Sequence, residues 1–163
     1  MSLKTAIQDF PKQFSYQPVV ENGDKLAQAT KFLVAGMGGS NHQTDILLAW
    51  QPYLDMIVRR DYGLPVLHDQ SRLIICCSYS GNTEEVIDAL EQARQRNLAV
   101  AVITIGGRLL ELAKQYGLPY IQIPDTGIQP RSHASLTAAA SSGCRGSRAL
   151  LIPPWNQSQS NMG

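Results

Sequence analysis

Short apolar runs alternate along this chain with longer stretches in which apolar and polar residues recur at helical spacing. The apolar runs predict five strands, at residues 31–35, 56–60, 73–77, 100–104 and 120–123. The stretches between them predict helices at residues 45–53, 84–96 and 108–116. The helices are expected because apolar side chains three and four positions apart lie on one helix face. A further short helix, broken at a proline, is expected within residues 2–14.

The alternation of strands and helices predicts the fold class. Strands separated by helices of ~10–15 residues are typical of parallel βαβ units. We therefore predict an α/β domain of three layers, with a five-stranded parallel sheet that is doubly wound and has helices on both faces. The run at residues 73–77 is apolar throughout, which indicates burial on both faces. Such sheets bind ligands beyond the carboxyl ends of their strands, so the loops at that edge are the places to look for function.

The composition divides the 163 residues into three parts. We expect a helical lead-in at residues 1–30, one domain at residues 31–131 and a low-complexity tail at residues 132–163. The tail contains no Asp, Glu or Lys, whereas the rest of the chain contains all 13 acidic residues. Two hypotheses fit the tail: a flexible C-terminus, or a reading frame lost near Ser132. Comparing the coding DNA in three frames separates them.

Charge and cysteine content exclude several classes of protein. The chain has 14 Lys and Arg against 13 Asp and Glu, so it lacks the basic excess of a nucleic-acid binder. No apolar run reaches the ~18 residues needed to cross a membrane, and the first residues lack the long apolar segment of a secretory signal. Cys76 and Cys77 fall in the buried strand, which favours core packing over a disulfide or metal site. We expect a cytoplasmic protein without nucleic-acid, membrane or metal partners.

The first candidate loop has the sequence GMGGS, at residues 36–40. Its glycines allow close approach of a ligand to the backbone, and the helix that follows favours an anion. A tight strand-to-helix turn explains the loop equally well. A dinucleotide-binding loop would need glycine at Asn41, and an acidic residue in place of Arg59 and Arg60. An NAD-dependent oxidoreductase is therefore disfavoured, and no cofactor is expected.

The second candidate loop has the sequence SYSGNT, at residues 78–83, between the buried strand and the clearest helix. Its three hydroxyl groups can converge on one ligand, and the unpaired amides of the first helical turn would complete a phosphate site. The loop has no lysine, so a Walker-type loop that binds a nucleoside triphosphate is not expected. N-capping by Asn82 or Thr83 would explain one polar residue but not the cluster.

These motifs resemble those of sugar isomerase (SIS) domains, and more specifically those of the bifunctional phosphoglucose/phosphomannose isomerases. The resemblance runs from about residue 32 to residue 132 and rests on five stretches: GMGGS at 36–40, RDYGLP at 60–65, SYSGNTEE at 78–85, IGG at 105–107 and QPRS at 129–132. It implies a substrate-binding set that comprises Gly38, Gly39, Ser40, Ser78, Ser80, Gly81, Asn82 and Thr83. It also implies that Arg131 is catalytic and stabilises the negative charge of a cis-enediolate intermediate.

The function implied by the resemblance is the sugar-phosphate binding of a glucose-6-phosphate/mannose-6-phosphate isomerase. The family places its proton-transferring glutamate and histidine beyond the equivalent of Ser132. This chain has no acidic residue after Asp125, and His133 has no clear equivalent in the family. We therefore expect a domain that binds a sugar phosphate but is incomplete and catalytically deficient. The alternative is a non-catalytic SIS module that senses a phosphosugar. The resemblance also implies paired domains, hence a homo-oligomer, most simply a dimer.

Overall fold

The structure is a computed structural model of the 163-residue chain and describes residues 18–66 and 70–125. The strands are β1 (Lys31–Gly36), β2 (Asp55–Arg59), β3 (Leu73–Cys77), β4 (Val100–Thr104) and β5 (Tyr120–Gln122). The α-helices are α2 (His42–Trp50), α3 (Glu84–Gln95) and α4 (Gly107–Gln115), and two 3-10 turns are η2 (Gly23–Lys25) and η3 (Gly38–Asn41). The helix expected at residues 2–14 and the tail at 132–163 lie outside the described residues.

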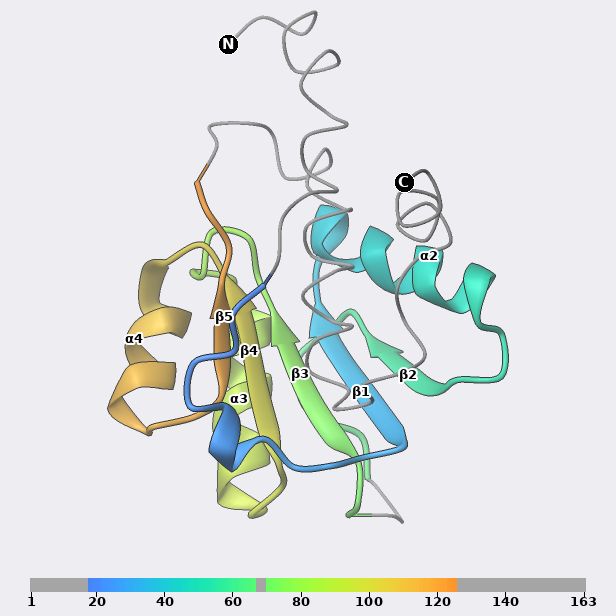
Figure 1. The fold of residues 1–163 in the computed structure, drawn as a ribbon, viewed down its shortest axis with the longest axis horizontal. Helices are drawn as coiled ribbons and strands as arrows, with labels where there is room; N and C mark the ends of the chain where they lie inside the picture. The colour runs from blue at the N-terminus through green and yellow to red at the C-terminus, as the bar shows by residue number, and fades with distance from the viewer. Residues whose placement is uncertain (1–17, 67–69, 126–163) are drawn as a thin grey trace, which may run out of the picture.

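The five strands form one parallel sheet in the order β2-β1-β3-β4-β5 (Figure 1). This confirms the predicted α/β class and the five-stranded parallel sheet. The strand order reverses between β1 and β3, because the chain leaves β1 toward one side of the sheet and later returns to its other side. Gly36 and Cys77 pair in register at the ends of these two strands. The loops that follow β1 and β3 therefore leave the sheet next to each other, at the switch point where such folds bind ligands.

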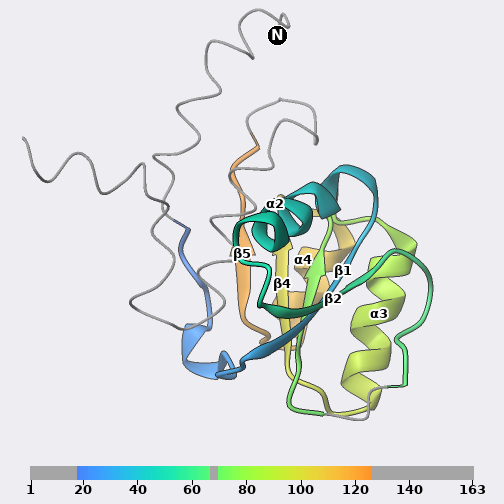
Figure 2. The ribbon, with the colours of Figure 1, turned by 90° about the vertical axis from the view of Figure 1, so that its right-hand side faces the viewer.

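The two faces of the sheet are packed differently within the described residues. α3 and α4 share one face, where Leu90 and Leu112 belong to the same apolar cluster as Ile74. On the other face, Val20 and Leu26 from the segment before β1 pack against the sheet. Figure 2 shows α3 on one side of the sheet and residues 18–30 on the other, with α2 above the carboxyl ends of the strands. This segment also hydrogen-bonds to the edge of the sheet, since Glu21 forms an antiparallel bridge with Tyr120.

The helix predicted at residues 45–53 is shifted in the structure, where α2 begins at His42 and ends at Trp50. Pro52 cannot continue the helix, because it lacks an amide proton and clashes with the preceding turn. Tyr53, the last residue of the predicted helix, therefore lies in a turn and is 99% exposed. The strands at residues 73–77 and 100–104 have the predicted bounds.

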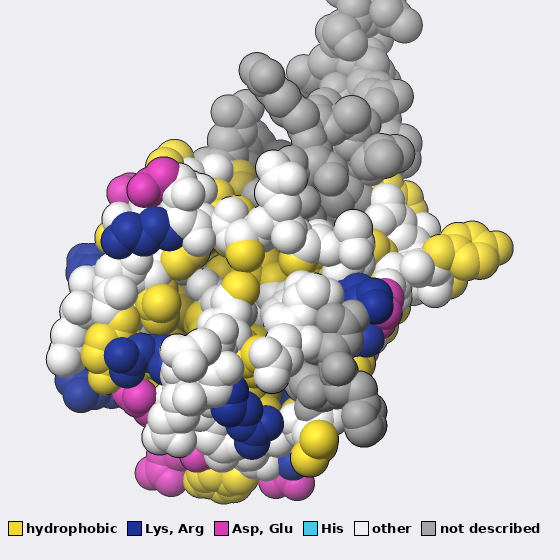
Figure 3. Space-filling model, turned by 90° about the horizontal axis from the view of Figure 1, so that it is seen from below, with side chains coloured by type: hydrophobic (Ala, Val, Ile, Leu, Met, Phe, Trp, Pro, Cys, Tyr) yellow, Lys and Arg dark blue, Asp and Glu magenta, His cyan; other side chains and the backbone are white. Residues whose placement is uncertain are grey.

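One arginine holds the amino ends of three strands together. The Arg72 guanidinium donates a hydrogen bond to the carbonyl of Phe32 at 3.2 Å and pairs with Asp55 Oδ1 at 2.7 Å. Seen from below, this end of the molecule shows positive and negative side chains interspersed around apolar ones (Figure 3). No helix among the described residues is long and apolar enough to cross a membrane.

Candidate functional site

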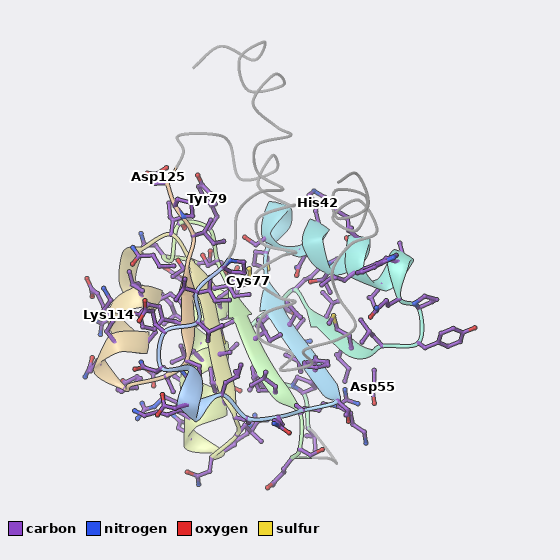
Figure 4. The ribbon with its side chains drawn as sticks, in the orientation of Figure 1. His42, Asp55, Cys77, Tyr79, Lys114 and Asp125 are labelled. Carbon is purple, nitrogen blue, oxygen red and sulfur yellow. The ribbon has the colours of Figure 1, made fainter. Side chains whose placement is uncertain are left out.

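The loops after β1 and β3 meet at the carboxyl end of the sheet. The amide of Tyr79 in the second loop donates a hydrogen bond to Ser40 Oγ in the first, at 3.2 Å. Figure 4 shows Tyr79, His42 and Asp125 at this same end, above Cys77. The two loops that sequence analysis selected separately are thus parts of one site, and Ser40 links them.

Two of the three predicted hydroxyl groups meet inside the second loop. Ser78 is 1% exposed, and its Oγ lies 2.7 Å from Thr83 Oγ1. Ser78 Oγ also accepts a hydrogen bond from the Gly81 amide at 3.1 Å. Because this hydroxyl already accepts one bond, it is best satisfied by donating its proton to Thr83. The half-buried Thr83 hydroxyl is then left free to donate to a ligand.

Ser80 does not join this pair. Its side chain is exposed, and its Oγ accepts a hydrogen bond from the Asn82 amide at 3.3 Å. The expectation that three hydroxyls converge therefore holds for Ser78 and Thr83, while Ser80 lies nearer to solvent. The arrangement is layered: Ser78 supports the loop from within, and Thr83 and Ser80 lie where a ligand can reach them.

The capping explanation for this loop does not fit α3. Thr83 occupies the N-cap position, but its side chain makes no capping hydrogen bond. The Asn82 side chain acts on a different helix, because its Oδ1 accepts a bond from the Arg108 amide in the first turn of α4 at 3.0 Å. Asn82 thus caps α4 from a distance. In the first turn of α3, the amide of Val86 donates to the Thr83 carbonyl at 3.2 Å, so the amides of Glu84 and Glu85 are the ones that helix geometry leaves without an intrahelical partner.

Glycines interlock the loops that precede α3 and α4. Gly81 has φ +73°, and a Cβ there would lie 1.7 Å from the Gly106 carbonyl oxygen. Gly107 has φ +68°, and its Cβ would lie 2.4 Å from the Ser80 carbonyl oxygen. The amide of Leu109 also donates to the Gly81 carbonyl at 2.8 Å. The amino termini of α3 and α4 are therefore adjacent, and the positive ends of both dipoles lie at the site.

For the loop that contains Gly106, the sequence predicts no role beyond its part in the family resemblance. Thr104, at the end of β4, is fully buried. Its Oγ1 donates to the Gly106 carbonyl at 2.9 Å and accepts from the Gly106 amide at 3.2 Å. The adjacent glycines at 106 and 107 are the sequence signal for this tight turn, but only the contacts show that it packs against the loop at residues 78–83.

The glycine loop is closed by Asn41 rather than left open. This side chain is 1% exposed and donates through Nδ2 to the carbonyl of Gly36. A Cβ at Gly36 would lie 3.1 Å from Asn41 Oδ1 and 3.0 Å from the Cys77 carbonyl. Gly36 thus allows the close approach of the two loops. Gly38 has φ +52° with open space around it, and it begins the 3-10 turn η3, to which Gly39 also belongs.

Several charged and titratable groups surround the site. Glu84 and Glu85 occupy the first turn of α3, whereas neither candidate loop contains Lys or Arg. The pKa of Tyr79 is raised by burial and by the nearby Asp125 carboxylate, so its phenol stays protonated and neutral. The two loops have no cationic side chains that could attract an anion. An anion at this site would instead be stabilised by hydrogen-bond donors and by the helix dipoles.

The other candidates have different environments or lie outside the described residues. Cys76 and Cys77 are buried in β3, as core packing requires, and burial raises the pKa of the Cys76 thiol. His42 is exposed at the start of α2. Arg131, the predicted catalytic residue, lies outside the described residues. Residues 18–66 and 70–125 contain no cluster of three or more His, Cys, Asp or Glu side chains suited to hold a metal ion.

Sequence comparison finds relatives that are named bifunctional phosphoglucose/phosphomannose isomerases. It is 38% identical over 111 residues to the bifunctional phosphoglucose/phosphomannose isomerase of Caldicellulosiruptor bescii, a match that covers 66% of this chain and 32% of the relative. It is 40% identical over 103 residues to the enzyme of the same name from Thermoplasma acidophilum, covering 63% and 32%. The chain thus spans about a third of the length of these curated relatives. No family model matches the chain.

Structure comparison shows that the chain has the fold of a sugar isomerase domain. The sugar isomerase domain of an RpiR transcription factor from Sphaerobacter thermophilus superimposes with a TM-score of 0.54 over 85% of each chain, at 15% identity. At this level of identity the likeness establishes the fold alone.

Proposed function

Because the chain is homologous to the bifunctional phosphoglucose/phosphomannose isomerases and has the fold of a SIS domain, we propose that it binds a hexose phosphate as the sugar-phosphate-binding domain of such an isomerase. The observation that carries this proposal is the loop at residues 78–83. Its Ser78–Thr83 hydroxyl pair and the amides of Glu84 and Glu85 in the first turn of α3 offer donors of the kind that a phosphate dianion needs.

The proposed contacts divide the site into two parts. Thr83 and Ser80 bind the phosphate, Ser78 and Gly81 shape the loop around it, and Asn82 holds α4 against it. Gly38, Gly39 and Ser40 lie along the sugar. Arg131 is the proposed catalytic residue and stabilises the enediolate charge; its support is the family resemblance, since it lies outside the described residues.

A ligand-binding experiment tests this proposal. Isothermal titration of the full chain with fructose 6-phosphate, fructose, inorganic phosphate and NAD should show binding of the two phosphate compounds only. Binding of fructose as tightly as its phosphate would contradict a phosphate site. Binding of NAD alone would favour an oxidoreductase.

The second candidate function is a non-catalytic module that senses a phosphosugar. It is favoured by the absence of any acidic residue after Asp125, since aldose–ketose isomerisation needs a base. Both functions predict the same binding, and only turnover separates them.

We also propose a homodimer in the cytoplasm. The support is apolar surface around α2 and β2, where Ile46, Trp50 and Ile57 are 51%, 40% and 37% exposed. Large apolar side chains that are exposed in a single chain are often covered at a protein interface. Light scattering of the full chain after size exclusion should give twice the 17.9 kDa monomer mass; a monomer at micromolar concentration would contradict it.

A further inference from the structure

The segment at residues 59–65, which follows β2, is held along one stripe of α3. The amide of Gly63 donates to Asp88 Oδ2 at 2.7 Å, and the amide of Leu64 donates to Gln92 Oε1 at 2.9 Å. Arg96, which directly follows the last residue of α3, donates to the carbonyl of Pro65 at 3.0 Å. Asp88, Gln92 and Arg96 are spaced four residues apart, so they lie on one helix face. The segment is therefore fixed on α3 by its own backbone groups.

The same stripe continues to the first residue of α3. Four residues before Asp88, the Glu84 carboxylate accepts a hydrogen bond from the Tyr62 hydroxyl at 3.0 Å. Arg59 fixes the backbone that follows the tyrosine side chain, because its guanidinium donates to the carbonyls of Tyr62 and Gly63. The hydrogen bond to Glu84 is the main reason that the pKa of Tyr62 is raised. The phenol thus remains a donor throughout the physiological pH range.

Glu84 lies where a carboxylate that is free to move would interfere with the proposed phosphate site. It follows Thr83 directly and opens the helix whose first-turn amides are the proposed anion donors. Side chains of a helix tilt toward its amino terminus, and an acidic group in the first turn is attracted to the same free amides. An unrestrained Glu84 would therefore compete with a phosphate and repel it.

We propose that Tyr62 is a positioning residue that holds the Glu84 carboxylate against the segment at residues 59–65 and so keeps the amino terminus of α3 open for phosphate. This inference rests on the proposed function. It also gives a role to the RDYGLP motif at residues 60–65, for which the sequence suggested none.

The test compares four variants of the full chain with the wild type: Tyr62→Phe, Glu84→Gln, the double variant, and Tyr116→Phe as a matched control. Tyr116 also donates to a glutamate of α3, Glu91 at 3.1 Å, but seven residues further along the helix. Affinity for inorganic phosphate and for fructose 6-phosphate is measured by calorimetry at low and high ionic strength.

We expect Tyr62→Phe to weaken phosphate binding about 2–5-fold at low salt, which is the size of a screened charge–charge effect at this range. The double variant should bind as tightly as Glu84→Gln alone, because the charge is gone whether or not it is held. The loss should shrink at high salt. Tyr116→Phe should bind like the wild type.

Two results would overturn the inference while leaving the proposed function intact. One is a Tyr62→Phe variant that binds phosphate like the wild type. The other is a double variant as weak as Tyr62→Phe, which would mean that Tyr62 acts by stabilising the fold. A wild-type chain that binds neither ligand would refute the proposed function, and the role of Tyr62 with it.

Discussion

At the scale of single residues, the site depends on how Ser78 and Thr83 share one hydrogen bond. Ser78 is buried and accepts from the Gly81 amide, so its proton is best used toward Thr83. A polarised chain of this kind makes Thr83 a stronger donor toward an anion. Under the proposed function, Thr83 is therefore the residue that we expect to present its hydroxyl to a phosphate, with Ser78 setting its direction.

Replacement of Thr83 by valine tests this division, because valine keeps the shape and removes the hydroxyl. We expect affinity for fructose 6-phosphate to fall about 10-fold or more, as for a lost hydrogen bond to a charged group. The control is Thr30→Val, at an exposed position before β1, which should leave affinity unchanged. Calorimetry on both variants makes the comparison, and equal affinities would remove Thr83 from the site.

Replacement of Gly81 by alanine should be among the most destabilising changes in the domain. The new Cβ would lie 1.7 Å from the Gly106 oxygen, at a backbone φ of +73°. The left-handed conformation alone costs about 1–2 kcal/mol, and the overlap must add to it, so we expect a loss above about 4 kcal/mol. Gly38→Ala shares the positive φ but meets open space and should cost only about 1 kcal/mol. Urea unfolding measures both; equal losses would argue against the interlock.

At the scale of elements, α3 is packed on two sides. On its apolar face Val86, Leu90 and Ala93 are buried in the core, as the helical spacing predicts, and Ile87 is partly buried against it. Its polar face is less exposed than the sequence suggests, because Asp88 is half-buried and accepts from the amide of Gly63. A helical pattern identifies polar positions but cannot show that a distant loop uses them as hydrogen-bond partners.

Replacement of Asp88 by alanine should therefore lower stability by about 1–2 kcal/mol, the cost of leaving a partly buried amide without its acceptor. The matched control is Glu111→Ala on α4, which breaks an exposed pair with Arg108 and should cost less than about 0.5 kcal/mol. Chemical denaturation at neutral pH gives both values. An Asp88 variant as stable as the control would mean that residues 59–65 are not fixed by this contact.

At the scale of the whole molecule, the central strands are buried deeply enough to suppress ionisation of a cysteine thiol. Cys76 is fully buried in β3, and burial raises the pKa of its thiol well above the usual value. The native state therefore keeps this proton at pH values where the unfolded chain loses it. Because the native pKa is the higher one, the stabilisation is complete below the unfolded pKa of about 8.5 and is lost progressively above it.

Stability should accordingly fall between pH 8.5 and 10, with Cys76 contributing about 1.4 kcal/mol per pH unit in the upper part of that range. The Cys76→Ala variant should show a shallower decline, whatever its stability at pH 7. Urea unfolding at several pH values measures both slopes. Identical slopes would contradict this account of Cys76.

Catalytic activity is also a property of the whole molecule. With no acidic residue after Asp125, we expect the chain alone to bind fructose 6-phosphate without isomerising it. A coupled assay that detects glucose 6-phosphate should show turnover far below the ~1–10³ s⁻¹ of ordinary enzymes. Turnover in that range would refute the deficiency and favour the complete isomerase.

The sequence alone determined the sheet and the two loops that carry the site. Runs such as residues 73–77 are apolar throughout, and this identifies a strand buried on both faces whatever surrounds it. The loops at residues 36–40 and 78–83 stood out because glycine and hydroxyl residues gathered after strands, where an α/β sheet binds its ligands.

Only the tertiary structure decided how these loops work together. The Ser40–Tyr79 bond, the Asn82 contact with α4 and the Tyr62–Glu84 pair join residues 22 to 39 positions apart. No local pattern encodes such contacts, because they arise from the strand order and from the register of β1 against β3. Propensity and periodicity act over a few residues, whereas the shape of this site is set by which strands become neighbours.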